Sequence, residues 1–157
     1  MINDDIKITE NKSLISDVSK FRKSLSTVKS DDTLFEKKAY KDENGNEKMD
    51  YDYDKIYDRL SSFAKAYNAV VEAGAESDSS TVLRNTLSMT NAVNASKKTL
   101  TAVGFTVNTD NTLSISKESL MKGDMNSAKY LFASTSNFAR QLDTASTNVA
   151  SQAASEV

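Results

Sequence analysis

The carboxylates between residues 42 and 54 come nearer than any other side chains in this sequence to a metal-binding pattern. The segment holds two acidic groups, Asp42-Glu43-Asn44-Gly45-Asn46 and then Asp50, Asp52 and Asp54. A calcium loop of the EF-hand type needs glycine at its sixth position and a bidentate glutamate at its twelfth. Counted from Asp42, those positions hold Glu47 and Tyr53. The segment therefore does not match an EF-hand loop, and we interpret it as a solvated turn.

Four tyrosines alternate with these acidic residues: Tyr40, Tyr51, Tyr53 and Tyr57. Tyrosine rings can stack on bases or sugars. Here the neighbouring carboxylates would repel phosphate groups, so hairpin packing or contact with another protein is the favoured interpretation.

The residue types that are absent exclude most catalytic chemistry. The 157 residues contain no Cys, His, Pro or Trp. Without imidazole and thiol groups there is no usual zinc site, no thiol nucleophile and no triad that depends on histidine. The four glycines, Gly45, Gly74, Gly104 and Gly123, stand too far apart for a phosphate-binding loop. We therefore expect a protein that is not an enzyme and binds no metal, nucleotide or other cofactor.

Charge and hydropathy limit the range of partners. The formal net charge is −2, so no basic excess is available for nucleic acid. No apolar run approaches the ~20 residues of a membrane span, and no apolar signal region follows Met1. We expect protein partners, without nucleic-acid binding, a membrane span or a cleaved signal peptide.

The spacing of apolar residues predicts a mainly α protein, an elongated antiparallel helical bundle or coiled coil in one domain over residues 1–157. Helices are expected at 12–29, 54–74, 79–103 and 136–155. The first two repeat heptad spacing, with Leu14, Val18, Phe21, Leu25 and Val28 in one and Ile56, Leu60, Phe63, Tyr67 and Val70 in the other. The third has a broader stripe formed by Val82, Leu83, Leu87, Met89, Val93, Leu100 and Val103.

One or two small β-hairpins are expected between the helices. Residues 105–115 alternate apolar and polar side chains around a Thr-Asp-Asn turn, and Gly104 can end the preceding helix. Ser116 and Asp124 can cap two short helices that follow. A second hairpin is predicted as an insertion at 34–53, where an Asn-Gly pair marks the turn.

The last helix has an apolar seam that tapers from large to small side chains: Phe138, Leu142, Ala145 and Val149. Small residues let helices approach closely but bury little area each. A partner chain could complete such a helix, and we take these four residues as candidate partner-binding positions. A frayed terminal helix of a monomer is the alternative.

Residues 63–132 resemble the C-terminal region of the flagellar filament-capping proteins, the hook-associated protein 2 family. Phe63-Ala64-Lys65-Ala66-Tyr67-Asn68 is similar to that family's F-x-x-x-Y-N helix start, and Val82-Leu83-Arg84 to the start of the next helix. The most specific part runs from Leu100 to Ile115 and resembles the family's L-x-x-[IV]-G-[IF]-[ST]…D-[GN]-T-L-S-[LI] hairpin. The resemblance implies antiparallel helices in an axial or cap structure, exported without a cleaved signal and without enzyme activity.

Two hypotheses of function follow. The first is a structural or assembly protein, extracellular at the bacterial flagellum or cell surface, whose partners are copies of itself or axial flagellar proteins. The second is a cytoplasmic four-helix adaptor or export chaperone that holds a partner helix in an exposed apolar groove.

Overall fold

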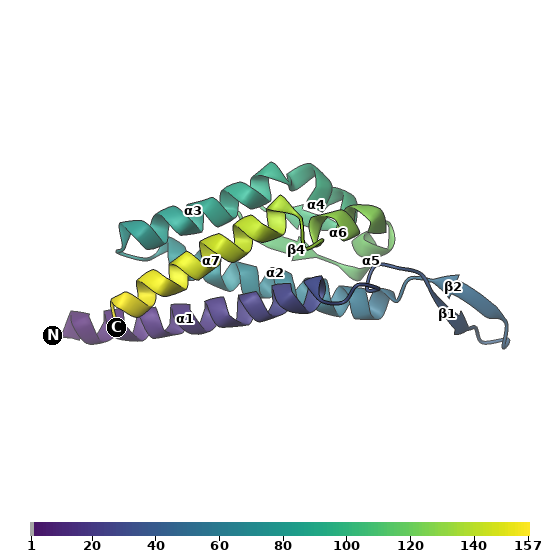
Figure 1. Cartoon of the computed structure of the whole chain (residues 1–157), viewed down its shortest axis with the longest axis horizontal. Helices are drawn as coiled ribbons and strands as arrows, with labels where there is room; N and C mark the ends of the chain where they lie inside the picture. The colour runs from purple at the N-terminus through teal and green to yellow at the C-terminus, as the bar shows by residue number, and fades with distance from the viewer. Residues whose placement is uncertain (1) are drawn as a thin grey trace.

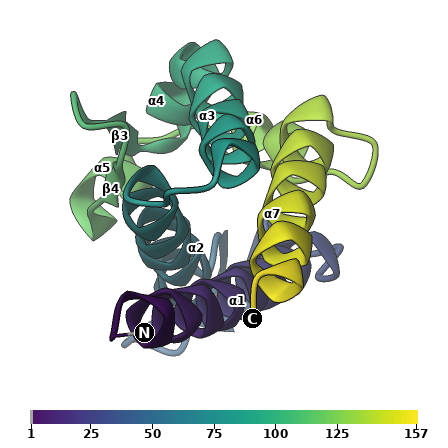
Figure 2. The same cartoon turned by 90° about the vertical axis from the view of Figure 1, so that its left-hand side faces the viewer.

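The computed structural model of the protein describes residues 2–157, with side chains from residue 5 onward. Four long helices run alternately in opposite directions: α1 (Ile2–Lys29), α2 (Tyr53–Ala75), α3 (Ser80–Ala95) and α7 (Asn137–Ser155). In cross-section they form a ring in which α1 contacts α2 and α7, and α3 contacts the same two helices (Figure 2). The mainly α, elongated bundle predicted from the sequence is confirmed (Figure 1).

Between α3 and α7 in the chain, a group of short elements packs at one end of the bundle, mainly against α2. It comprises α4 (Lys97–Val103), β3 (Phe105–Val107), β4 (Leu113–Ile115), α5 (Lys117–Met121) and α6 (Met125–Leu131). β3 and β4 pair antiparallel, with Phe105 opposite Ile115. Gly104 ends α4 at a positive φ of 126°, which an L side chain rarely adopts. The predicted hairpin at 105–115 is therefore confirmed.

A second hairpin projects from the same end of the bundle (Figure 1). β1 (Lys38–Lys41) and β2 (Glu47–Asp50) pair antiparallel, with Lys38 opposite Asp50 and Lys41 opposite Glu47. Gly45 supplies the positive φ, 78°, that the turn requires. The hairpin predicted within 34–53 is confirmed, and its side chains are largely exposed.

The core is built from the two predicted heptad seams. All ten seam residues of α1 and α2 are buried. Phe63 lies at the centre of an aromatic cluster, with ring centroids 5.6 Å from Phe21, 5.2 Å from Phe132, 6.2 Å from Phe105 and 6.4 Å from Phe138. One apolar cluster thus joins the long helices to the short elements.

Side chains cap the helices where the sequence places hydroxyls and carboxylates. Ser116 accepts from the N–H of Ser119, and Asp124 accepts from the N–H of Asn126, as predicted for α5 and α6. Ser136 starts α7 in the same way, through the N–H of Ala139. These bonds satisfy N–H groups that would otherwise lack a partner at the helix starts.

Two predicted helix boundaries were wrong. The helix expected over 79–103 is divided at Ser96, whose N–H is shared between the carbonyls of Ala92 and Val93. The tight turn redirects the chain, so that Leu100 and Val103 are buried in α4, which packs on α6. The first helix begins at Ile2 rather than 12, since no proline or glycine interrupts residues 2–29.

The predicted apolar stripe of the third helix also needs correction. Leu83 and Leu87 are 40% and 58% exposed, whereas Thr86 and Thr90 are buried in their place. The buried row of α3 is Val82, Thr86, Met89 and Val93, which repeats the heptad spacing of α1 and α2. Because Thr86 is polar, the pattern of apolar residues in the sequence did not reveal this row.

Candidate functional site

The candidate partner-binding residues of α7 lie inside the molecule. Phe138, Leu142, Ala145 and Val149 are all buried in the common core, where α7 packs against both α1 and α3. The bundle itself covers this face, so these four side chains are not exposed for a partner chain. The sequence could not show it, because the residues that cover α7 are spread over two distant helices.

The acidic turn of the projecting hairpin has a structural use. One carboxylate oxygen of Asp42 accepts hydrogen bonds from the backbone N–H groups of Asn44 and Asn46, each at 2.9 Å. Asp110 has the corresponding role in the β3–β4 turn, where it accepts from the hydroxyl and N–H of Thr112. These bonds from Thr112 lower the pKa of Asp110. Both carboxylates therefore organise turns, as the sequence predicts.

A groove of about 570 Å³ lies where the projecting hairpin meets the bundle. It is lined by residues of β1, the end of β2, the connection to α2, the start of α2, and α5: Lys38, Ala39, Tyr40, Asp50, Tyr51, Asp52, Tyr53, Asp54, Lys117 and Met121. Tyr51 and Tyr53 stand with ring centroids 5.8 Å apart. Lys117 forms an ion pair with Asp54 across the groove. We call this the hairpin groove; it combines aromatic rings with charges of both signs.

The tyrosines of the sequence pattern take different positions around the hairpin groove. Tyr40 is 50% exposed, whereas Tyr51, Tyr53 and Tyr57 are partly buried against the core. Burial raises the pKa of Tyr53, and the Asp50 carboxylate and Tyr51 raise it further. The Lys37 ammonium lies 5.7 Å from the centroid of the Tyr51 ring. The inner rings anchor the hairpin, and Tyr40 is presented to solvent on one face of it. Met49, which is 62% exposed, is paired with Ala39 and lies on the opposite face.

Tyr67 and Asn68 attach the β3–β4 hairpin to α2. The Asn68 amide donates to the carbonyl of Leu113 at 2.8 Å and accepts from its N–H at 2.7 Å. The Tyr67 hydroxyl donates to the carbonyl of Asn111 at 3.2 Å, and burial raises the pKa of that hydroxyl. These residues have a structural role: they hold the edge of a hairpin that, within residues 2–157, pairs with no third strand.

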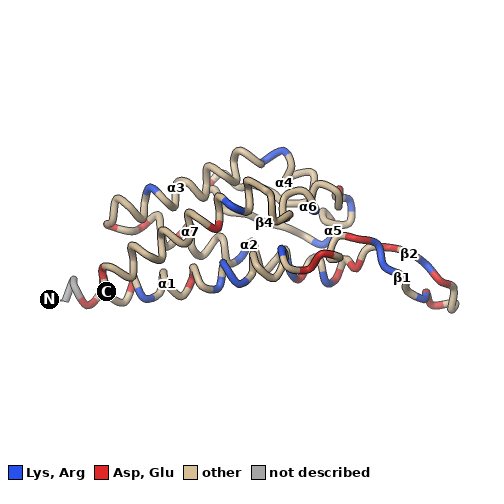
Figure 3. The backbone as a smooth tube through the Cα atoms, in the orientation of Figure 1, with Lys and Arg blue, Asp and Glu red and all other residues tan. Residues whose placement is uncertain are grey.

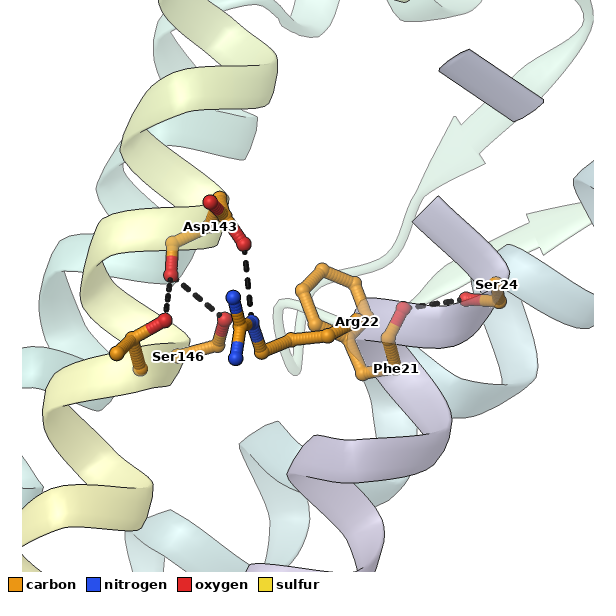
Figure 4. A network of polar contacts seen from close by, with 6 residues as sticks. Phe21, Arg22, Ser24, Asp143 and Ser146 are labelled. Carbon is orange, nitrogen blue, oxygen red and sulfur yellow. Dashed lines mark hydrogen bonds and ion pairs between the residues drawn. The ribbon is translucent and has the colours of Figure 1, made fainter. Parts of the chain in front are cut away.

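A polar contact links α1 to α7 near the middle of the bundle (Figure 4). The Arg22 Nε donates to a carboxylate oxygen of Asp143 at 3.1 Å. The carbonyl of Asp143 accepts from the hydroxyls of Ser146 and Thr147, at 3.1 and 2.7 Å. The ion pair is about half exposed, and it aligns two helices rather than forming a reactive site.

A second groove, of about 740 Å³, runs between α3 and α7. Its lining is nearly uncharged: Asn85, Ser88, Asn91, Ala92, Ala95, Asn137, Arg140, Gln141, Thr144, Ala145 and Asn148. The Asn148 amide donates to the Asn85 amide oxygen across it, at 3.2 Å. We call it the amide groove. No motif in the sequence marked it; its signal is the scarcity of charge in the second half of the chain.

Charge is distributed unevenly over the molecule. Residues 1–76 contain 13 Lys or Arg and 16 Asp or Glu, against 7 and 6 in residues 77–157. Lys, Arg, Asp and Glu concentrate on α1, α2 and the projecting hairpin, while α3 and α7 are mostly neutral (Figure 3). The two grooves therefore present different chemistry, one mixed in charge and the other dominated by amides.

Within residues 2–157, no helix is both long and apolar enough to cross a membrane. Comparisons of the chain with protein-family models, with curated proteins and with solved structures give no match.

Proposed function

We propose that this chain is a non-enzymatic structural or assembly protein, a short rod that contacts other protein chains through its projecting hairpin. The observation that carries the proposal is the position of β1 and β2. They extend beyond the end of the bundle opposite to the two termini (Figure 1). Tyr40 and Met49, on opposite faces of the hairpin, are exposed. Large apolar side chains on a projecting element suit protein contact.

The exposed area supports an extended subunit. The chain has 9097 Å² of accessible surface and a mass of 17.2 kDa. A compact monomer of that mass is expected to expose about 7,800 Å². The excess is consistent with a protein whose shape serves contact with neighbours.

The hairpin also offers backbone hydrogen bonds. β1 and β2 pair only with each other, so the outer edge of each strand has unpaired N–H and C=O groups. Lysines at 38, 41 and 48 oppose indiscriminate strand addition. A partner strand with acidic residues opposite these lysines would pair with the free backbone groups and also balance the lysine charges.

The resemblance to flagellar cap proteins supplies the proposed location. On that basis the chain acts outside the cell, at a bacterial flagellum or cell surface, exported without a cleaved signal peptide. Its partners would be copies of itself or axial flagellar proteins. The helical bundle would supply a rigid body, and the hairpin a specific contact.

The test follows tagged protein in cells that produce it. Intact cells, sheared surface appendages and cytosol are probed for the wild type and for a variant in which residues 37–51 are replaced by a short Gly-Ser linker. Lys38 and Asp50 are paired neighbours, so a short linker can close the gap. We expect wild type in the appendage fraction, and at least a tenfold smaller share for the variant.

A matched control, Lys20→Ala on the exposed side of α1, should incorporate as wild type does. Circular dichroism of the purified variants checks that helicity is kept. Wild type confined to the cytosol would overturn the proposal. Equal incorporation without the hairpin would overturn the hairpin's part in it.

The cytoplasmic adaptor or export chaperone is the second candidate, favoured by the exposed Leu83 and Leu87 on α3. Those two side chains, one helical turn apart, could hold the apolar face of a partner helix. The same fractionation separates the candidates, because an adaptor or chaperone would remain in the cytosol together with its client protein.

A further inference from the structure

The outer edge of β2 has backbone groups that are free to pair with another strand. The Asp42 N–H donates to the Asn46 carbonyl at 3.0 Å, and this bond fixes the phase of the ladder between β1 and β2. Hydrogen-bonded pairs alternate along an antiparallel ladder, so Lys48 and Asp50 direct their backbone groups to β1. The N–H and C=O groups of Met49 therefore point away from β1, to the outer edge.

The rest of the chain leaves this edge uncovered. Within residues 2–157, β2 pairs with no strand other than β1. The hairpin groove touches three consecutive residues of β1, 38–40, but only the last residue of β2, Asp50. The remaining part of β2, residues 47–49, is exposed. The hairpin groove thus borders β1, and the edge of β2 is open to solvent.

The alternation of backbone groups limits how β2 can pair with an identical strand. Residues can stand opposite each other only when their backbone groups point the same way, so a two-fold axis must pass between a residue and its own copy. Registers centred on Glu47, Lys48 or Asp50 place two like charges directly opposite each other, which is destabilising. The register centred on Met49 places two uncharged side chains there.

The register centred on Met49 also pairs opposite charges. Lys48 of each copy then stands opposite Asp50 of the other, and Glu47 stands opposite Tyr51. The Lys48–Asp50 pairs occupy non-hydrogen-bonded positions, where the Cα atoms are about 4.5 Å apart and side chains approach most closely. Cross-strand pairs of opposite charge stabilise an antiparallel ladder. The lysine that discourages other strands therefore meets a carboxylate in this register.

We propose that β2 pairs antiparallel with β2 of a second copy of this chain, in the register centred on Met49, and that the two hairpins form one four-stranded sheet. The inference rests on the proposed assembly function and names one partner for the hairpin. The two Met49 side chains stand side by side on one face of that sheet, each next to Ala39 of its own hairpin. The contact satisfies free backbone groups and covers exposed apolar surface together.

The outer edge of β1 matches itself less well. Registers centred on Lys38 or Lys41 place two lysines opposite each other, and the register centred on Ala39 places Lys37 opposite Lys41. The register centred on Tyr40 avoids these pairs, but β1 contains no carboxylate to balance its lysines. Charge therefore favours pairing through β2.

The contact is small, so we expect a weak dimer. Each copy contributes residues 47–51, a length of about 17 Å at 3.4 Å per residue. The interface stays below about 1,200 Å² in total, in the range of transient complexes. We expect a dissociation constant of about 0.1 to 1 mM. A contact of that strength suits an assembly in which many copies are held close together.

Single cysteines locate the contact, because the chain contains none of its own. In the proposed register, residue 49 and its copy have Cα atoms about 5.5 Å apart, within reach of a disulfide. Ala39→Cys is the matched control, since Ala39 is exposed and stands opposite Met49 in the same hairpin. At about 100 µM protein in a glutathione redox buffer, we expect Met49→Cys to form dimers at least tenfold faster than Ala39→Cys.

Charge reversal tests the register in the Met49→Cys background. Lys48→Glu places a carboxylate opposite Asp50 of the other copy, so dimer formation should slow at least fivefold. Lys20→Glu, on the exposed side of α1, changes the net charge equally and should leave the rate unchanged. In the wild type, NMR between about 50 µM and 1 mM should show the Met49 amide shifting with concentration more than the Ala39 amide.

Met49→Cys that dimerises no faster than Ala39→Cys would overturn the proposal, as would a rate that Lys48→Glu leaves unchanged or a wild-type Met49 amide that does not shift up to 1 mM. The assembly proposal is judged by its own fractionation. Hairpin-dependent incorporation without this crosslinking would mean that the hairpin contacts a different protein. Crosslinking of a protein confined to the cytosol would overturn the assembly proposal alone.

Discussion

The α1–α2 pair and the α3–α7 pair belong to one bundle but are held together by different side chains. The α1–α2 seam consists of large residues, among them Phe21, Leu60, Phe63 and Tyr67. In α3 and α7, many buried residues are small or carry a hydroxyl: Thr86, Thr90, Ala92, Ala139, Ala145, Ser146 and Ala153. Large side chains stabilise the α1–α2 pair by burying apolar surface. The small side chains of α3 and α7 let the helices approach closely and make van der Waals contacts.

The buried hydroxyls of α3 and α7 are compatible with a stable core. Thr86 donates to the carbonyl of Val82 at 2.8 Å, and Ser146 donates to that of Asp143 at 3.1 Å. Among the described residues, no buried side-chain polar atom lacks a hydrogen-bond partner. The buried hydroxyls of α3 and α7 therefore avoid the penalty of unpaired polar groups.

The largest expected effect tests whether α7 belongs to the core at all. Leu142→Asp removes a buried side chain and places a carboxylate in an apolar seam, at an expected cost of about 5 kcal/mol or more. Burial should raise the pKa of the new carboxyl, so stability should fall further as pH rises above the unfolded value of about 3.9.

Urea unfolding of Leu142→Asp, followed by circular dichroism at pH 4 and pH 8, measures both effects. We expect the variant to be less stable at pH 8 than at pH 4, relative to wild type. Unchanged stability at both pH values would place Leu142 in solvent and contradict the closed ring of four helices.

The second prediction concerns the α1–α2 side of the comparison. Phe63→Ala empties the centre of the aromatic cluster, and we expect a loss of about 3 to 5 kcal/mol. Ala145→Gly in the α3–α7 seam is the matched case; it removes one methyl group and a helix preference of about 1 kcal/mol. If chemical denaturation gave equal losses for the two variants, the two helix pairs would not differ as described.

The sequence revealed the α1–α2 pair far better than the α3–α7 pair, and side-chain size is the reason. Large apolar residues at heptad spacing allow few interpretations, so the seams of α1 and α2 were predicted residue by residue. In α3 the buried row contains Thr86 and Thr90, while two leucines lie outside it. In α7 the buried row tapers to alanine, and periodicity alone did not show that its face was covered.

Local turns and caps were also predictable, but the surfaces were not. Gly45 and Gly104 marked turns that need positive φ, and Ser116 and Asp124 marked helix starts. The division at Ser96 depends on the contact of α4 with α6, which no local signal records. The hairpin groove and the amide groove are assembled from separate segments, so only the fold brings their residues together.

The third prediction uses the pH dependence of Tyr67 in the α2 seam. Burial raises the folded-state pKa of Tyr67 above the ordinary tyrosine value of about 10, so the stability that its neutral form provides is lost as pH rises above about 10. Tyr67→Phe should cost about 1 kcal/mol at pH 7, because the hydrogen bond to Asn111 is lost.

Above pH 10 the same Tyr67→Phe variant should lose stability less steeply than wild type, by up to about 1.4 kcal/mol per pH unit. Urea titrations at pH 7, 9.5 and 11 provide the comparison. Parallel pH profiles for the two proteins would show that Tyr67 ionises as freely in the folded chain as in the unfolded one.

The smallest expected effect concerns the Arg22–Asp143 contact between α1 and α7, which links the two helix pairs (Figure 4). Both side chains are about half exposed, at 49% and 44%, so water and salt screen their attraction. A double-mutant cycle with Arg22→Ala and Asp143→Ala should give a coupling of about 0.2 to 1 kcal/mol, which shrinks as salt rises from 0.05 to 1 M.

The control cycle uses Lys122 and Glu118, an exposed pair within one short segment. Its coupling energy should be smaller, because this pair joins no separate helices. A coupling above about 2 kcal/mol that resists salt would mean that this contact is shielded from water, and that charge, rather than packed side chains, sets how α7 sits on α1.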